Sequence, residues 1–124
     1  MPVAPADGKL GVVCVGLGAV ATTFIAGVEL IRRGMAEPIG SLTQMGTVRL
    51  GKRTDDRSPA VGELVPLAGL DDIVFGAWDP YPDDAYVSAL NAGVLDAARH
   101  LEPIGDTLRA IRPMPAAFDP SYVK

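Results

Sequence analysis

Cysteine and histidine are almost absent from this sequence, which has one residue of each among 124. A lone cysteine, Cys14, forms no disulfide within the chain, so nothing in the sequence requires an oxidising compartment. Together with His100 it is also too little for a metal-ligand cluster, and the two have no spacing typical of a nucleophile and its base. We therefore expect no metal site, and we expect His100 to be a surface residue near a helix end.

Basic residues are outnumbered by acidic ones. The chain has 11 Lys and Arg against 15 Asp and Glu, which gives a formal net charge of -4. Binding to nucleic acid needs clustered Lys and Arg, so we expect no nucleic-acid partner. The charge does not exclude a nucleotide, because backbone N–H groups can hold its phosphates.

Long apolar runs are missing as well. No stretch reaches the roughly 20 apolar residues that a membrane helix needs. The N-terminus lacks the basic start of a signal peptide, and Asp7 comes before the first apolar run. We expect no membrane association, a cytoplasmic location, and a flexible lead-in over residues 1–9.

The sequence does contain a well-defined strand pattern near its start. Leu10–Val15 is a continuous, largely β-branched apolar run, typical of a strand that is buried on both faces of a parallel sheet. Cys14 lies inside this run, so we expect it to be buried and unreactive. Gly16 and Gly18 then end the strand.

A helix is predicted from Ala19 to Arg33. Its last turn carries Arg32 and Arg33, which suit the negative end of the helix dipole, and Gly34 is a typical residue just after a helix. The apolar positions that we expect to face the core recur at helical spacing. They are Val20, Phe24, Val28 and Ile31, widened by Ile25 and Leu30.

The rest of the chain alternates between irregular and regular patterns. Residues 35–69 are broken repeatedly by proline and glycine, and we interpret them as an irregular insertion. Within the insertion, Thr47–Leu50 could be a short strand and Gly51–Arg57 reads as an exposed loop. Ile73–Trp78 then repeats the buried-strand pattern.

Two further helices are expected after the second strand. Pro82-Asp83-Asp84 is typical of a helix start, with one of the two acids as N-cap, and the helix is expected to run to about His100. A shorter helix follows, from about Pro103 to Ile111. The order is that of an α/β, Rossmann-like doubly wound parallel sheet, of which residues 10–124 would form the N-terminal portion. We expect Leu10–Val15 and Ile73–Trp78 to pair in parallel.

The glycines after the first strand fit a dinucleotide-binding fingerprint. Gly16, Gly18 and Ala21 match the G-x-G-x-x-G/A pattern, between a strand and a helix as the pattern requires. Gly16 would allow the tight turn, Gly18 would let a pyrophosphate approach the backbone, and Ala21 would let helix and strand lie close. The alternative is an ordinary glycine-rich connection, and the context favours dinucleotide binding.

Asp79 is the candidate for the acid that binds the ribose hydroxyls in such domains. It directly follows the second strand, but it comes 63 residues after Gly16, whereas about 20 is usual. Asp79 could instead be a turn residue before Pro80, since this pair is common in turns. The local pattern alone does not decide between a ribose-binding acid and a turn residue. If Asp79 is the ribose acid, we expect its carboxylate across a cleft from Gly18.

Three blocks of sequence resemble a known family. They are VGLGAVATT at Val15–Thr23, GSLTQMGTVRL at Gly40–Leu50 and DIVFGAWDP at Asp72–Pro80. In this order and spacing they resemble the N-terminal, NAD-binding part of myo-inositol-1-phosphate synthase, in a bacterial branch. Ser41–Gln44 is a marker of the family, and we interpret it as a structural turn.

The resemblance implies an isomerase that converts glucose 6-phosphate to inositol phosphate. In this family NAD oxidises one hydroxyl, enolisation and aldol cyclisation follow, and the hydride is then returned to the product. It implies that the pyrophosphate turn is Gly16, Gly18, Ala19, Val20 and Ala21, and that Asp79 holds the adenosine ribose. Better-known members have Gly-Asn-Asn where this sequence has Ala19-Val20-Ala21. Hydrogen bonds from asparagine side chains cannot be made here, so backbone contacts would have to hold the pyrophosphate.

The same resemblance places the catalytic lysines and the catalytic and oligomerisation domain beyond Lys124. The chain alone is therefore expected to be inactive, and a full-length member to be a homo-oligomer. Two other hypotheses remain at this point: a different NAD-dependent oxidoreductase, and a non-catalytic nucleotide-sensing module. Asp79 favours NAD over NADP in either case, because a carboxylate repels a 2′-phosphate.

Overall fold

Three parallel strands form one sheet, in the order β1-β2-β3. The computed structural model describes residues 2–117, 119 and 121. Strand β1, Leu10–Val15, pairs along its whole length with β2, Ile73–Asp79. The short strand β3, Met114–Pro115, continues the sheet beside the end of β2. The two predicted strands and their parallel pairing are confirmed, whereas β3 was not anticipated.

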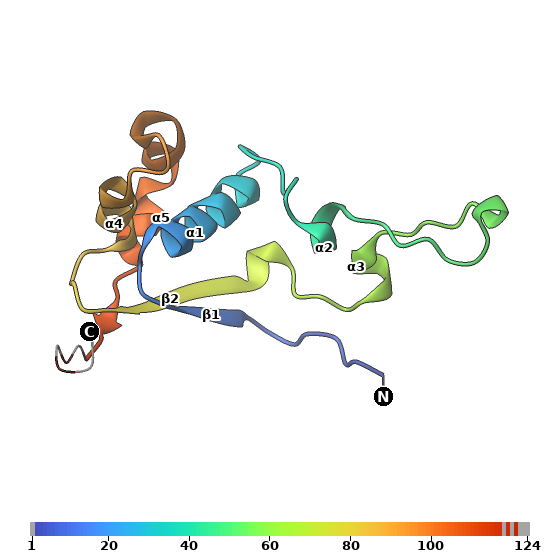
Figure 1. The fold of residues 1–124 in the computed structure, drawn as a ribbon, viewed down its shortest axis with the longest axis horizontal. Coiled ribbons are helices and arrows are strands. Elements are labelled where there is room, and N and C mark those ends of the chain that lie inside the picture. The colour runs from blue at the N-terminus through green and yellow to red at the C-terminus, as the bar shows by residue number, and fades with distance from the viewer. Residues whose placement is uncertain (1, 118, 120, 122–124) are drawn as a thin grey trace.

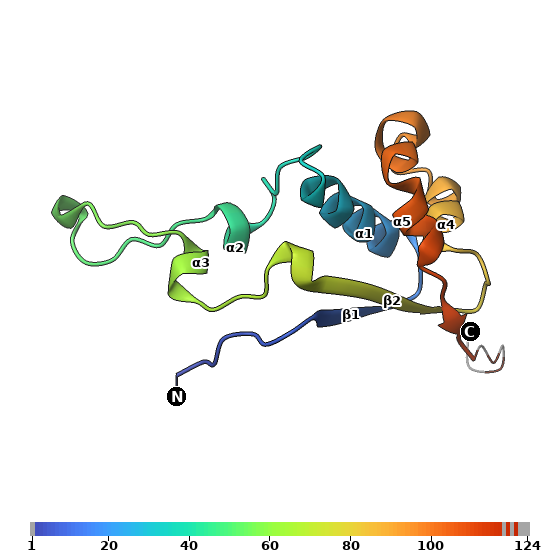
Figure 2. The same ribbon diagram turned by 180° about the vertical axis from the view of Figure 1, so that it is seen from behind.

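The helices lie on one side of this sheet. Helix α1, Ala19–Arg32, follows β1, and helices α4, Ala85–Ala92, and α5, Gly105–Ala110, lie between β2 and β3 in the chain (Figures 1 and 2). In both views no described helix or loop covers the opposite face of the sheet. The arrangement is the α/β class expected from the sequence.

The expected burial of β1 on both faces is wrong for this structure. Side chains of a strand alternate between the two faces, and the helices cover only one of them. Val13 and Val15 point to the open face and are 48% and 88% exposed. Cys14 points to the helices, where it packs against the core, but it is half-buried rather than buried. Its low reactivity stays a prediction.

Helix α1 ends as predicted and buries part of the predicted apolar face. Gly34 has φ +69° and its N–H donates to the carbonyl of Ile31. Ile25, Val28 and Leu30 are buried as expected, but Val20 is 85% exposed and Phe24 46% exposed. The helix has apolar residues on two sides, and contact with the sheet and α4 selects the side with Ile25 and Leu30.

The core lies between the sheet, α1 and the segment that follows β2. Its fully buried large side chains come from α1 and from residues 101–108: Ile25, Leu101, Ile104 and Leu108. The cluster also includes Ala77 of β2, whose small side chain faces the helices. The four large side chains therefore come from only two segments, which pack together in one core cluster with Ala77 of β2.

The long helix predicted from Asp84 to His100 is interrupted. The carboxylate of Asp84 accepts the N–H of Val87, which confirms the predicted acidic N-cap and shows that it is the second of the two acids. The helix ends at Ala92 because Gly93 adopts φ +64° and returns its N–H to carbonyls of the last turn.

A second run of helical turns replaces the end of the predicted helix. A π-helical turn, Ala97–Leu101, is followed by a 3₁₀ turn, Glu102–Ile104, and then by α5. His100 is half-buried in the first of these turns, and its Nδ1 accepts the N–H of Asp96 at 3.1 Å. The short helix predicted near Pro103 is confirmed in position.

Two polar clusters tie these elements together. Arg32 of α1 forms an ion pair with the buried Glu29 and donates to the carbonyls of Leu70 and Ile73, at the start of β2. In the second cluster the Tyr86 hydroxyl donates to Glu102, and this hydrogen bond holds the pKa of Tyr86 above its ordinary value.

Residues 35–69 form an arm that extends away from the rest of the molecule (Figure 1). It contains two single-turn helices, α2 at Leu42–Met45 and α3 at Val61–Leu64, and no described residue of the arm is buried. The predicted strand Thr47–Leu50 is not formed. Residues 47–50 instead make one bridge and two hydrogen bonds with residues 57–60, where Pro59 has no N–H to extend the ladder.

Candidate site at the carboxyl ends of the strands

A tight glycine turn joins β1 to α1. Gly16 has φ +92°, a conformation that favours glycine, and its N–H donates to the carbonyl of Trp78 at 2.7 Å. Gly18 is the N-cap of α1 and provides no side-chain hydrogen bond. The first N–H groups of a helix have no partner within the helix, so the start of α1 offers donors and a partial positive charge to an anion.

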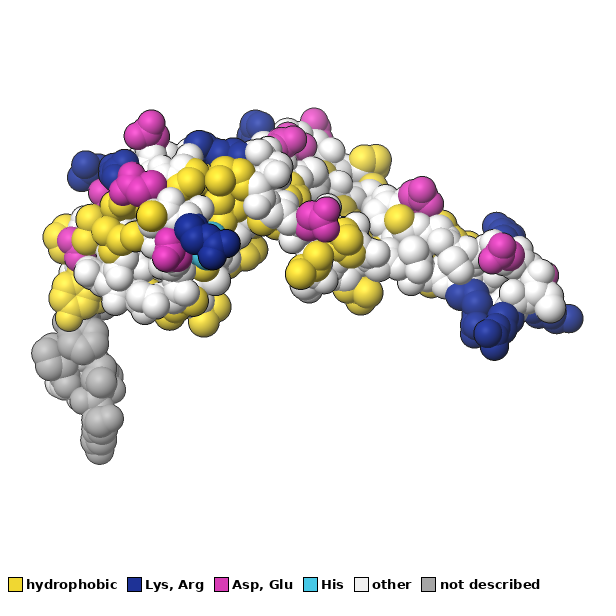
Figure 3. Space-filling model, turned by 90° about the horizontal axis from the view of Figure 1, so that it is seen from above, with side chains coloured by type: hydrophobic (Ala, Val, Ile, Leu, Met, Phe, Trp, Pro, Cys, Tyr) yellow, Lys and Arg dark blue, Asp and Glu magenta, His cyan; other side chains and the backbone are white. Residues whose placement is uncertain are grey.

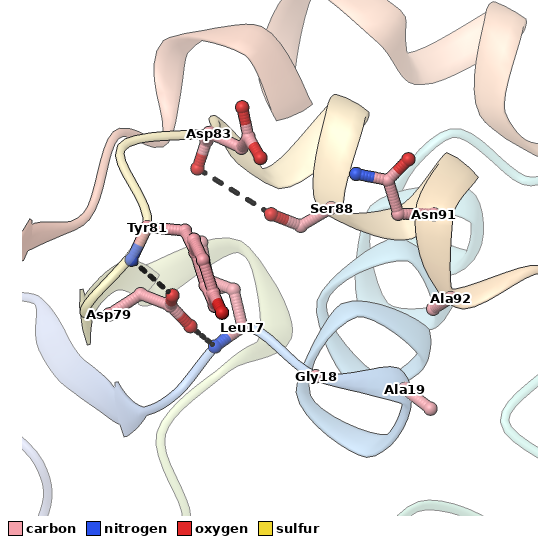
Figure 4. Close-up of a pocket in the computed structure, with 9 residues that line it drawn as sticks. All are labelled: Leu17, Gly18, Ala19, Asp79, Tyr81, Asp83, Ser88, Asn91 and Ala92. Carbon is pink, nitrogen blue, oxygen red and sulfur yellow. Dashed lines mark hydrogen bonds between the residues drawn. The ribbon is translucent and has the colours of Figure 1, made fainter. Parts of the chain in front are cut away.

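Asp79, the last residue of β2, is bonded directly to this turn. Its Oδ2 accepts the N–H of Leu17 at 2.8 Å and its Oδ1 accepts the N–H of Tyr81 at 2.9 Å (Figure 4). One carboxylate therefore joins the ends of two strands that are distant in the chain. The expected position across a cleft from Gly18 is corrected, since the carboxylate lies against the glycine turn itself.

A pocket of about 470 Å³ opens at this point (Figure 4). Its walls come from the glycine turn, the end of β2, the loop after β2 and one side of α4. The lining residues are Leu17, Gly18, Ala19, Asp79, Tyr81, Asp83, Ser88, Asn91 and Ala92. The pocket lies at the carboxyl edge of the sheet, where ligands of open α/β sheets bind.

The structure brings together three of the six residues proposed from the sequence. Gly18, Ala19 and Asp79 line the pocket, whereas Gly16 and Ala21 do not. Gly16 contributes through the shape of the turn. Val20 faces a neighbouring apolar hollow with Phe24 and Val94, outside the pocket. The binding roles of all six residues stay predictions.

Four polar or aromatic lining residues were not anticipated: Tyr81, Asp83, Ser88 and Asn91. The adjacent acids at 83 and 84 were both interpreted as helix-start residues, but Asp84 alone caps α4. Ser88 and Asn91 are three residues apart, which places them on one side of the helix. That spacing was a signal in the sequence, although only the packing of α4 beside the glycine turn shows which side faces the pocket.

The pocket is negatively charged. Asp79 and Asp83 contribute carboxylates, and none of the nine lining residues is Lys or Arg. Carboxylates accept hydrogen bonds from hydroxyl groups and repel phosphates. The pocket therefore suits a sugar with free hydroxyls, while a phosphate group would be held by the backbone N–H groups where α1 begins.

A parallel α/β sheet with a glycine turn and a strand-end acid at its carboxyl edge defines the Rossmann class of nucleotide-binding domains. Residues 10–124 match the family model of the NAD-binding domain of myo-inositol-1-phosphate synthase. The chain belongs to the myo-inositol-1-phosphate synthase family. The domain that it matches is the one that binds NAD, the cofactor of this family.

Individual relatives agree with this assignment. The chain is 49% identical, over 97% of its length, to inositol-3-phosphate synthase 1 of Bacteroides thetaiotaomicron, of which it covers 27%. It is 33% identical, over 93% of its length, to inositol-3-phosphate synthase isozyme 1 of Arabidopsis thaliana, of which it covers 25%. The higher identity with the bacterial protein agrees with the resemblance to a bacterial branch.

The fold is shared with a solved structure. A crystal structure of inositol-3-phosphate synthase from Caenorhabditis elegans superimposes with a TM-score of 0.79 at 23% identity, over 93% of this chain and 25% of that one. The chain thus spans about a quarter of the length of the relatives that it matches. Among the described residues, no helix is both long enough and apolar enough to cross a membrane.

Proposed function

We propose that this chain is the NAD-binding part of an enzyme that converts glucose 6-phosphate to inositol phosphate. The hydrogen bond from the Leu17 N–H to the Asp79 carboxylate carries the proposal of NAD binding, because it places a strand-end acid beside an uncapped helix N-terminus. The proposed reaction follows from membership of the family. Bound NAD would supply a reversible hydride acceptor for the substrate. The chain's own residues would bind and orient this cofactor.

The residues present fit the pyrophosphate and the adenosine ribose of the cofactor. A Cβ added to Gly18 would meet no atom within 4 Å, so the backbone there is open to a pyrophosphate. The N–H groups of Ala19, Val20 and Ala21 belong to the first turn of α1 and would donate to it. Asp79 would accept the ribose hydroxyls with the lone pairs that its two backbone hydrogen bonds leave free.

Other features of the whole enzyme are part of the same proposal. We infer a homo-oligomer in the cytoplasm, with glucose 6-phosphate bound mainly by residues outside this chain. Support comes from the family resemblance and, for the location, from the single cysteine, which requires no oxidising compartment.

The direct test is NAD binding to the complete protein with Asp79 changed. We expect Asp79→Ala to weaken NAD binding at least tenfold, since a hydrogen bond to a charged group contributes about 1.5–3 kcal/mol and about 1.4 kcal/mol is a factor of ten. Asp79→Asn should weaken binding less because one acceptor oxygen remains. Asp71→Ala is the control, since Asp71 is exposed and lies outside the pocket.

A comparison of two ligands separates ribose binding from a purely structural role in the turn. ADP and 2′,3′-dideoxy-ADP would be used as competitors of NAD. If Asp79 bonds the hydroxyls, the unaltered protein prefers ADP and Asp79→Ala loses this preference. If Asp79→Ala weakens the binding of ADP and of dideoxy-ADP equally, Asp79 only shapes the turn. If Asp79→Ala leaves the affinity for NAD unchanged, the proposed site is wrong.

A further inference from the structure

Asp83 is the one pocket carboxylate to which the described structure assigns no structural role. It lies in the loop between β2 and α4 and is exposed. No ion pair or side-chain hydrogen bond involves its carboxylate among the described residues. Its main-chain carbonyl accepts the Ser88 hydroxyl at 3.5 Å, and the helix cap is its neighbour, Asp84.

Asp79 differs in this respect. Both of its carboxylate oxygens accept backbone N–H groups, so replacing it disturbs the glycine turn as well as the charge of the pocket. Asp83 therefore contributes a charge to the pocket that can be removed without breaking a hydrogen bond. Figure 4 shows the two acids on different walls, with Asp79 against the glycine turn and Asp83 at the start of α4.

A negative charge beside the adenosine ribose disfavours NADP but not NAD. NAD has a free ribose 2′-hydroxyl, whereas NADP has a phosphate there, and proteins that accept NADP place an arginine nearby. Here the lining residues include two carboxylates and no Lys or Arg. A 2′-phosphate beside Asp79 would share this pocket with Asp83, and like charges that share a pocket repel each other.

We propose that Asp83 strengthens the preference of this site for NAD over NADP, in addition to the effect of Asp79. The inference rests on the proposed function, because it assumes that the adenosine ribose lies in this pocket. Asp79 shapes the turn, accepts the ribose hydroxyls and repels a 2′-phosphate, while Asp83 adds a second repulsive charge. Asp83 differs from Asp79 in that its charge can be removed without loss of a hydrogen bond to the glycine turn.

The experiment measures the affinities of the complete protein for NAD and for NADP and takes their ratio. We expect Asp83→Asn to reduce the preference for NAD about three- to tenfold, and Asp83→Arg to reduce it further by adding an attractive charge. The effect should shrink as salt is raised, since the groups are exposed. Asp71→Asn, which removes an exposed acid outside the pocket, should leave the ratio unchanged.

The outcomes distinguish this inference from the proposal on which it rests. If the unaltered protein binds NAD but both Asp83 variants keep its cofactor ratio, the role of Asp83 is overturned and the proposed function stands. If the unaltered protein binds neither cofactor, both are overturned. Thermal unfolding of each variant shows whether the fold is intact, which is expected because the Asp83 carboxylate bonds to no described group.

Discussion

The arm and the remainder of the chain, which we term the body, use similar residues to different effect. Every buried residue of the described structure belongs to the body. The arm contains large apolar residues too, but all of them are at least partly exposed. Those that are most exposed are Met35, Ile39, Leu42, Met45, Val48, Leu64, Val65 and Leu67. Apolar composition alone thus does not produce a core.

The difference lies in how the apolar residues are spaced. In the body they recur with the period of a strand or a helix, so they gather on one face that another element covers. In the arm, prolines and glycines interrupt the chain every few residues and leave only single helical turns. Figure 3 shows the result, a narrow extension with Lys and Arg side chains gathered at its far end.

The largest expected effect of a substitution is in the body. Leu101 is fully buried in the core of the body, so Leu101→Ala should lower the free energy of unfolding by about 2–5 kcal/mol through lost burial and a cavity. Urea unfolding of the complete protein measures this change. If Leu101→Ala lowers the free energy of unfolding by less than about 1 kcal/mol, the core of the body is not the main source of the protein's stability.

Two glycines of the body should respond in opposite directions. Gly16→Ala forces a side chain into φ +92° and should cost about 1–2 kcal/mol, although no atom lies close enough to clash. Gly27 lies inside α1 with open space beside it, so Gly27→Ala should stabilise the protein by about 0.5–1 kcal/mol. Equal effects of the two changes in thermal unfolding would contradict the assigned turn geometry.

The smallest effect is expected in the arm. Leu42 is 73% exposed, so Leu42→Ala should change the free energy of unfolding by no more than about 0.5 kcal/mol, in contrast to the same substitution at Leu101. The same urea series supplies the measurement. A loss near that of Leu101→Ala would show that the arm is covered in the complete protein, and the contrast with the body would then fail.

Much of the site was predictable because its signals are local. The glycine turn lies between a strand pattern and a helix pattern, and Asp79 directly follows a second strand pattern, so residue order alone placed both at one edge of a parallel sheet. The positive φ of Gly16 is likewise a property of a few adjacent residues. Recognition of the family then made the long insertion before Asp79 understandable.

By itself the sequence determined the strands β1 and β2, the extent of α1, the glycine that ends it at Gly34 and an acidic start for α4, since each depends on neighbouring residues. The parallel order of the two strands followed from the helix between them. Only the tertiary structure decided which side of α1 is buried, where the helix after Asp84 breaks, and that Asp79 bonds the N–H of Leu17. These outcomes depend on contacts between segments far apart in the chain, and a local pattern does not specify which of two apolar faces, or which of two adjacent acids, such a contact will use.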